Sequence, residues 1–194
     1  GQYRLGMRLL QLGARKASGL DLRTLARPVM KSLHAEFDET VNLAVPGDDG
    51  IIYIDILQSA RGLRMAATVG MRDPYHSSAL GKAMLAHLPE PRVEQMVGGS
   101  LGRKTERTVA TIERLKEELA EVRRRGYAID DEENEVGARC VGAPILDHRG
   151  QCAGAISVSG SASRLTNERI ATLAERVRSA AAAISHTMGY QTRA

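Results

Sequence analysis

Two serines near residue 158 have the spacing of hydrogen-bond donors to one small polar molecule. The segment from Gln151 to Ser159 alternates apolar and polar residues, which predicts a strand. Side chains two positions apart in a strand share a face, so Ser157 and Ser159 lie beside Ala153 and Ala155, with the hydroxyls about 7 Å apart. These small side chains leave a hollow above the sheet. An alternative is that both serines face water.

A second candidate site lies at the predicted start of a helix. Pro74 disfavours helix before it, and the serines that follow are good N-caps, so a helix is expected to begin near Ser77 or Ser78. The first N–H groups of a helix have no partner within it, so those of Ala79 and Leu80 can hold a carboxylate. The alternative is an ordinary capped helix with water at its end. Together with the two strand serines, this helix start predicts a site for a small organic acid.

Composition argues against several classes of protein. A chain of 194 residues fits one domain with a real core. It has no apolar run long enough to span a membrane and no secretory leader, so no membrane partner and a cytoplasmic location are expected. Its two cysteines lack CxxC spacing, which argues against a zinc site and implies no metal. No phosphate-binding glycine motif supports a nucleotide fold, and no cofactor is predicted.

The charge pattern argues against direct DNA binding by these residues. The net charge of +4 is a mild basic excess. The densest basic run, Arg123 to Arg125, ends a predicted helix, and the acidic run from Asp130 to Glu135 follows closely. With one Phe and no Trp, a surface for stacking bases is not expected.

The predicted elements indicate an α+β fold with a mainly antiparallel sheet covered by helices. Apolar alternation and turn residues predict strands at Thr40 to Val45, Ile51 to Gln58, Leu63 to Val69, Tyr127 to Asp131, Val141 to Leu146 and Gln151 to Ser159. On the last of these, Cys152, Ile156 and Val158 are expected to share the apolar face.

Amphipathic stripes predict the covering helices. They are expected at Tyr3 to Lys16, Leu22 to Phe37, near Ser78, at Glu90 to Val97, from Ile112 to Gly126, and after the N-cap Thr166. Pro28 falls inside the second helix and is expected to kink or split it. The run Ala180 to Ala183 in the last helix permits close approach of another element.

Several stretches, taken in order, resemble the ligand-sensing domain of IclR-type bacterial transcriptional regulators. They are YRLGMRLLQLG, ETVNLAV, HSSALGKAMLA, GYAIDDEENEVGARCVGAPI, AGAISVSGSASRLT and the closing helix. The resemblance covers nearly the whole chain, and the block that begins at Gly126 is its most specific part.

The resemblance implies a sensor domain of GAF-like or profilin-like fold that assembles as a homodimer or homotetramer. In that family an N-terminal winged helix-turn-helix binds DNA, and a linker helix joins it to the sensor. Residues 1–18 are accordingly expected to be the C-terminal part of the linker helix and residues 19–190 the effector-binding domain. The DNA-reading domain is expected to be absent from this chain, so operator DNA is a partner only through it.

The family's ligand site falls on Ala79, Leu80, Asp130, Cys140, Ser157 and Ser159. Four of these are the positions already found from the residues, whereas Asp130 and Cys140 rest on the resemblance. Asp130 can accept a hydroxyl proton, and Cys140 offers a weak thiol donor. Met65 is expected to line the apolar side of the site, with plain core packing as the alternative.

Three functions remain open from the sequence. The favoured one is a non-enzymatic sensor in which a small organic acid shifts the arrangement of subunits and thereby DNA binding. The second is a thiol enzyme with Cys140 as nucleophile, His76 as base and Asp130 as its orienting group. The third is an oligomerising domain without a ligand.

Overall fold

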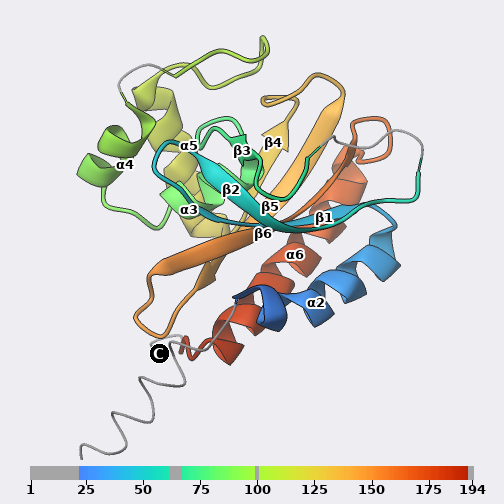
Figure 1. Cartoon of the computed structure of the whole chain (residues 1–194). Coiled ribbons are helices and arrows are strands. Elements are labelled where there is room, and N and C mark those ends of the chain that lie inside the picture. Colours follow the sequence, from blue (N-terminus) through green and yellow to red (C-terminus); the bar gives the residue numbers. More distant parts are fainter. Residues whose placement is uncertain (1–21, 62–66, 99–100, 192–194) are drawn as a thin grey trace, which may run out of the picture.

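The computed structural model describes residues 22–61, 67–98 and 101–191. Their strands form one sheet in the order β3-β2-β1-β6-β5-β4, and every pairing is antiparallel (Figure 1). The strands are β1 (Thr40–Pro46), β2 (Ile51–Leu57), β3 (Arg72–Asp73), β4 (Ala128–Asp131), β5 (Ala138–Leu146) and β6 (Cys152–Ser161). The predicted α+β class with an antiparallel sheet is confirmed.

Helices cover both faces of this sheet (Figure 1). On one face α2 (Leu22–Phe37) packs against α6 (Asn167–Thr187). On the other, α3 (Ala79–Leu85) lies on β5 and β6, with α5 (Ile112–Arg125) beside it. The short helix α4 (Glu90–Val97) follows α3 in the chain.

The two faces of the sheet have separate cores. Leu43, Ile156 and Val158 point toward α2 and α6, where Met30 and Leu173 meet them. Smaller strand residues such as Ala44, Ala128 and Ala155 point toward α3 and α5. Because these side chains are small, α3 can approach the sheet closely.

Capping residues set most helix boundaries where the sequence predicts them. Ser78 is the N-cap of α3, and its hydroxyl accepts from Gly81 N–H at 3.1 Å. Thr111 and Thr166 cap α5 and α6 in the same way, and Gly126 ends α5 in the left-handed conformation. These residues satisfy backbone groups that a helix end leaves open.

Pro28 does not split α2. The helix runs without interruption from Leu22 to Phe37. Pro28 lies on the exposed side, whereas Ala26, Met30 and Leu33 are buried on the other. Packing of that apolar stripe maintains the helix despite the amide hydrogen that proline lacks.

The predicted strand from Leu63 to Val69 is wrong in its described part. Residues 67–69 are not in a strand, because the chain turns at Gly70, whose φ is +89°. Gly70 and Met71 share backbone hydrogen bonds with Tyr53, and the regular ladder with β2 begins at Arg72. The predicted linker helix at residues 1–18 and Met65 lie outside the described residues.

The face assigned to Cys152 is also wrong. Ile156 and Val158 belong to the core under α2 and α6, but Cys152 packs in the opposite core. The pairing of β5 with β6 shifts between Ile145 and Leu146, where a bulge adds one residue to β6. One extra residue moves a side chain to the other face of the sheet.

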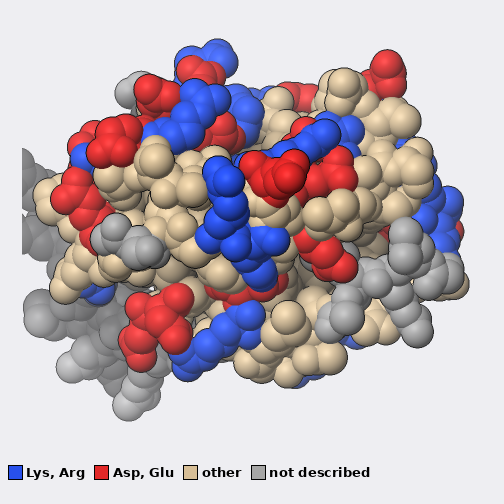
Figure 2. Space-filling view, turned by 90° about the horizontal axis from the view of Figure 1, so that it is seen from above, with Lys and Arg blue, Asp and Glu red and all other residues tan. Residues whose placement is uncertain are grey.

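Charges of both signs are interspersed on the surface. Figure 2 shows Lys and Arg beside Asp and Glu over most of the face seen from above. Ion pairs on the surface include Arg107 with Asp131 at 2.9 Å and Lys116 with Glu94 at 2.6 Å. In the described ranges, no helix has the length and apolar character needed to cross a bilayer.

Gly142 permits the close contact between α3 and the sheet. A Cβ atom there would lie 2.9 Å from the carbonyl carbon and oxygen of Ala79 and 3.1 Å from the nitrogen of Leu80. We expect Gly142→Ala to lower the free energy of unfolding by about 1–3 kcal/mol, because backbone must move to admit the methyl group. Urea denaturation measures this change.

The matched control for Gly142 is Gly102→Ala, since a Cβ at Gly102 meets nothing within 4 Å. The control is expected to leave the urea midpoint nearly unchanged. Equal stabilities of the two variants would contradict the contact between α3 and β5.

Candidate functional site

Polar side chains form two adjacent rows across the sheet, on the face that α3 covers. In one row Asp130 of β4 pairs with Cys140 of β5, which pairs with Ser159 of β6. In the other, Gly142 pairs with Ser157, which pairs with Asn42 of β1. Directly paired residues of an antiparallel sheet point to the same face, so these side chains are neighbours.

The start of α3 lies over the second row. Ala79 and Leu80 sit directly above Gly142, which is the strand partner of Ser157. Their N–H groups precede the first intrahelical hydrogen bond, which runs from Lys82 N–H to Ser78 C=O at 2.9 Å. The structure therefore brings the helix start next to the two strand serines.

Asn42 joins the two serines. Its side-chain N–H₂ donates to Ser157 Oγ at 3.3 Å and to Ser159 Oγ at 3.0 Å. Both hydroxyl oxygens therefore act as acceptors toward Asn42, which leaves their protons for other acceptors. The Oδ1 atom of Asn42 is buried and has no hydrogen-bond partner among the described residues.

Asp130 is a buried carboxyl with an altered acidity. Its Oδ1 accepts from the N–H groups of Glu133 at 2.8 Å and Asn134 at 3.2 Å. Burial raises the pKa of Asp130 to about 7, and the nearby Glu133 raises it as well, whereas the two N–H groups oppose the shift. Asp130 can therefore change its charge near neutral pH.

The thiol of Cys140 lies in the same environment and is 5% exposed. Burial raises the pKa of Cys140 well above its ordinary range, and the Asp130 carboxylate raises it further. A hydrogen bond with Ser159 opposes this shift but does not cancel it. The sulfur is consequently a protonated thiol at neutral pH.

A buried ion pair fixes α3 to the loop after β4. Lys82 has no exposed surface, and its Nζ lies 2.5 Å from Glu133 Oε1 and 3.8 Å from Glu118 Oε1. Burial raises the pKa of Glu133, and the Lys82 charge only partly offsets this. The second oxygen, Oε2, is buried without a hydrogen-bond partner in the described ranges.

Tyr53 and Asp73 border the same region. The Tyr53 hydroxyl donates to Asp73 Oδ2 at 2.8 Å, and Lys104 Nζ lies 3.3 Å from Asp73 Oδ1. Burial raises the pKa of Tyr53, and the charges of Asp73, Cys140 and Asp130 add to the shift. These electrostatic interactions place Tyr53 near the first row.

His76 is hydrogen-bonded elsewhere. Its Nε2 lies 2.9 Å from the carbonyl oxygen of Gly102. Burial lowers the pKa of His76, and the charges of Lys104 and Lys82 lower it further. Asp130 interacts with Cys140 rather than with the histidine ring, so the order of contacts needed for a Cys-His-Asp relay is not seen among these described residues.

Six of the seven predicted ligand positions thus lie together in the structure, and their role in binding stays a prediction. The seventh, Met65, is outside the described residues. Sequence reasoning missed Asn42, Tyr53, Asp73 and Lys82. A polar residue inside the apolar strand TVNLAV and a lone charge inside the helix ALGKAML are signals that point to two of them.

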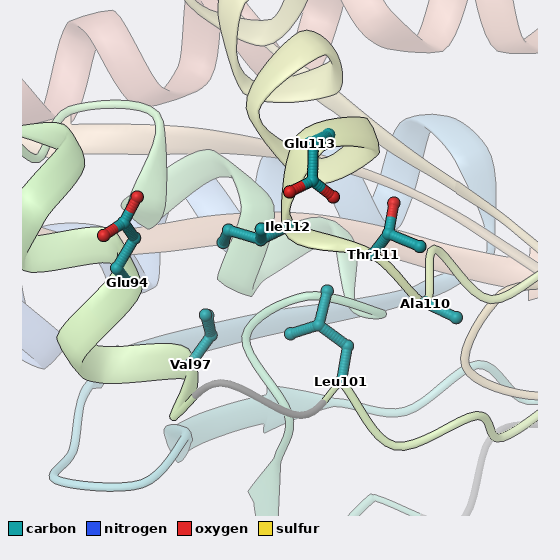
Figure 3. A pocket seen from close by; sticks show the side chains of 7 residues that line it. All are labelled: Glu94, Val97, Leu101, Ala110, Thr111, Ile112 and Glu113. Atoms are coloured by element: carbon teal, nitrogen blue, oxygen red, sulfur yellow. The ribbon is translucent and has the colours of Figure 1, made fainter.

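A separate hollow of about 560 Å³ lies between α4 and the start of α5. Figure 3 shows the side chains of Val97, Leu101 and Ile112 converging on it, with the carboxylates of Glu94 and Glu113 at its side. None of the predicted ligand positions lines it. Within the described ranges, no three His, Cys, Asp or Glu side chains are grouped to hold a metal ion.

Comparison with known proteins identifies relatives of similar domain structure. Residues 14–186 match the family described as bacterial transcriptional regulator IclR C-terminal. The chain is 36% identical to the HTH-type transcriptional regulator KdgR of Escherichia coli over 97% of its own length and 72% of that protein. It is 35% identical to the transcriptional repressor IclR of the same organism, over 97% of this chain and 70% of that one.

Solved structures agree with this assignment. The crystal structure of the Escherichia coli KdgR C-terminal domain superposes with a TM-score of 0.80 and 34% identity, covering 88% of this chain and 100% of that one. The Thermotoga maritima IclR structure gives a TM-score of 0.84 and 33% identity, over 95% of this chain and 75% of that one. The chain therefore belongs to the IclR family of bacterial transcriptional regulators, with residues 14–186 corresponding to the C-terminal domain of that family.

Proposed function

We propose that this domain senses a small organic acid whose carboxylate binds between the start of α3 and the serine-bearing strand. The carboxylate accepts from the N–H groups of Ala79 and Leu80 and from the hydroxyls of Ser157 and Ser159. Asp130 and Cys140, in the same row as Ser159, contact the part of the ligand that lies toward β4. Charge-assisted hydrogen bonds of this kind are stronger than neutral ones, so an anion is favoured.

The arrangement of Asn42 is the observation that supports this proposal most. Its side-chain N–H₂ group donates to the oxygen of Ser157 at 3.3 Å and to the oxygen of Ser159 at 3.0 Å. The Ser157 hydroxyl is thereby set as a donor toward a third group, whereas the ligand would share the Ser159 hydroxyl with the Cys140 sulfur. A buried acceptor such as the unpartnered Asn42 Oδ1 costs about 1–3 kcal/mol, which a donor on the ligand would recover.

The proposal assigns DNA binding to a helix-turn-helix domain outside these 194 residues. KdgR is called HTH-type, and this chain covers 72% of it. Residues 1–18 would be the end of the connecting helix and residues 19–190 the sensor, in a homodimer or homotetramer in the cytoplasm. Effector binding would regulate operator DNA if it favoured one arrangement of the subunits over another.

The thiol-enzyme alternative has less support. Burial keeps the Cys140 thiol protonated, and His76 is hydrogen-bonded to a backbone carbonyl. The relatives KdgR and IclR are transcriptional regulators. A purely oligomerising domain would give no account of the buried unpartnered oxygen of Asn42.

A thermal-shift screen of keto acids, sugar acids and aromatic acids tests the sensor proposal. At 100 times its Kd, a ligand that binds only the folded state adds about 2.7 kcal/mol of stability. For a domain of this size the melting temperature then rises by roughly 5–10 °C. Ser157→Ala should weaken binding by about tenfold or more, because it removes a hydrogen bond to a charged group.

The control for this screen is Ser163→Ala, the same substitution at an exposed serine. It is expected to bind the acid as the unchanged chain does. Absence of any acid that shifts the melting temperature of the unchanged chain would remove the support for the sensor proposal.

The affinity for the acid should depend on pH through Asp130. Its pKa of about 7 means that the carboxyl is neutral below pH 7 and charged above it. The charged form repels the bound carboxylate, so the Kd should rise by roughly tenfold as the pH increases from 5.5 to 8.5. Asp130→Asn keeps the oxygen that accepts from Glu133 and Asn134 and cannot ionise, so its Kd should change much less.

Titration calorimetry at pH 5.5, 7.0 and 8.5 measures this difference. Asp147→Asn is the control, since Asp147 also accepts from two backbone N–H groups but lies in the exposed hairpin turn. Parallel pH profiles for the unchanged chain and Asp130→Asn would show that Asp130 does not face the ligand.

The Cys140 thiol should be chemically inert in the folded domain. In a Cys152→Ser background, iodoacetamide at pH 7.5 should modify Cys140 about 100 times more slowly than glutathione, because the sulfur is buried and protonated. Mass spectrometry follows the reaction, and urea should restore the ordinary rate. Rapid modification of the folded chain would instead favour the thiol-enzyme alternative.

A further inference from the structure

A groove with a volume of about 660 Å³ lies where the C-terminal ends of α5 and α6 approach β5. Its apolar lining comes from Pro144, Leu146, Ala181 and Ala182. Its basic side chains are those of His87, Arg123, Arg178 and His186, and Tyr190 adds a phenol group. No Asp or Glu of the described ranges lines the groove, so its local charge is positive.

Arg123 has no carboxylate partner in the described part of the chain, unlike the two arginines that follow it. Arg124 pairs with Glu121 at 2.7 Å, and Arg125 pairs with Glu118 at 2.8 Å. The residues one helical turn before Arg123 are Leu119 and Ala120, which offer no charge. Helix α5 therefore presents one guanidinium to the groove without local neutralisation.

A backbone hydrogen bond holds this guanidinium in place. Arg123 Nε donates to the carbonyl oxygen of Ala86 at 2.7 Å. The two terminal nitrogens stay available for a bidentate contact, which is the geometry that carboxylates and phosphates favour. Arg178 is partly neutralised by Glu175 at 2.5 Å. An anion that binds in the groove would compete with Glu175 for the Arg178 guanidinium.

We propose that this groove is a second binding site, for a small amphipathic carboxylate. The carboxylate lies between Arg123 and Arg178, and its apolar body packs on Pro144, Leu146 and the alanines of α6. The groove volume is in the usual range for small-molecule sites, about 300–1,000 Å³. Ala181 and Ala182, from the alanine run noted in the sequence, thus form part of the groove surface, while Ala180 and Ala181 also pack in the core below α6.

The groove and the proposed effector site lie at opposite ends of α3. Ala86 is the C-cap of this helix and contacts Arg123, whereas Ala79 and Leu80 begin it over Gly142. Seven helical residues span about 10 Å. A ligand that repositions Arg123 therefore acts on the element that forms the effector site. This coupling rests on the proposed function, whereas the groove site itself does not.

Amide NMR of the chain during titration with benzoate tests the groove, because it reports each site separately. We expect saturable shifts at Ala181 and Ala182, with benzamide causing much weaker ones because it lacks the charge. Shifts at Ala79 and Leu80 report the effector site independently. Arg123→Gln and Arg178→Gln should each raise the Kd at the groove by about tenfold.

Two further variants sharpen the test. Glu175→Gln removes the competing carboxylate and should lower the groove Kd, which a loss of folding cannot imitate. Arg176→Gln makes the same charge change on α6 at a residue that pairs with Glu36 outside the groove, and should leave the Kd unchanged. The proposal is wrong if the groove amides do not shift, if benzamide matches benzoate, or if Arg176→Gln weakens binding as much as Arg178→Gln. Shifts over α6 that depend on protein concentration would instead show a second copy covering the groove.

Discussion

The buried ammonium of Lys82 constrains the arrangement around the candidate site. A charge with no exposed surface is costly unless a partner meets it at close range, and Glu133 does so at 2.5 Å. This contact requires the loop after β4 to fold back over α3. The same fold-back places the N–H groups of Glu133 and Asn134 on Asp130. Removing one partner of such a pair typically costs about 3–5 kcal/mol, so helix, loop and carboxyl form one unit.

Patterns in neighbouring residues predict the structure correctly where a single strand or a single helix end determines it. The two-residue period of β6 places Ser157 and Ser159 on one face, and the N-cap Ser78 fixes the start of α3. Both follow from nearest neighbours in the sequence. The same patterns fail at Cys152, because a bulge changes the period. At Pro28 the helix is not split, because packing of its apolar stripe outweighs the lost hydrogen bond.

The missing parts of the site depend on contacts between distant segments. Asn42 matters because β1 pairs with β6, and Tyr53 meets Asp73 across 20 positions of sequence. Neither partnership has a local signature. Asp130 and Cys140 are candidates through family resemblance, because no local pattern singles them out. Adjacent positions on three strands join them to Ser159, in surroundings that raise the pKa of both.

Helix α3 has few ways to respond to a ligand at either end. Its residues are all buried, Gly142 admits no side chain beneath its start, and Arg123 donates to the carbonyl oxygen of its C-cap, Ala86. A displacement along the helix would have to stretch the Lys82–Glu133 pair or lift the first turn from the sheet. Close-packed elements of this kind shift as rigid units between discrete arrangements. A small displacement of either end of α3 would therefore also displace the β4–β5 loop and the end of α5.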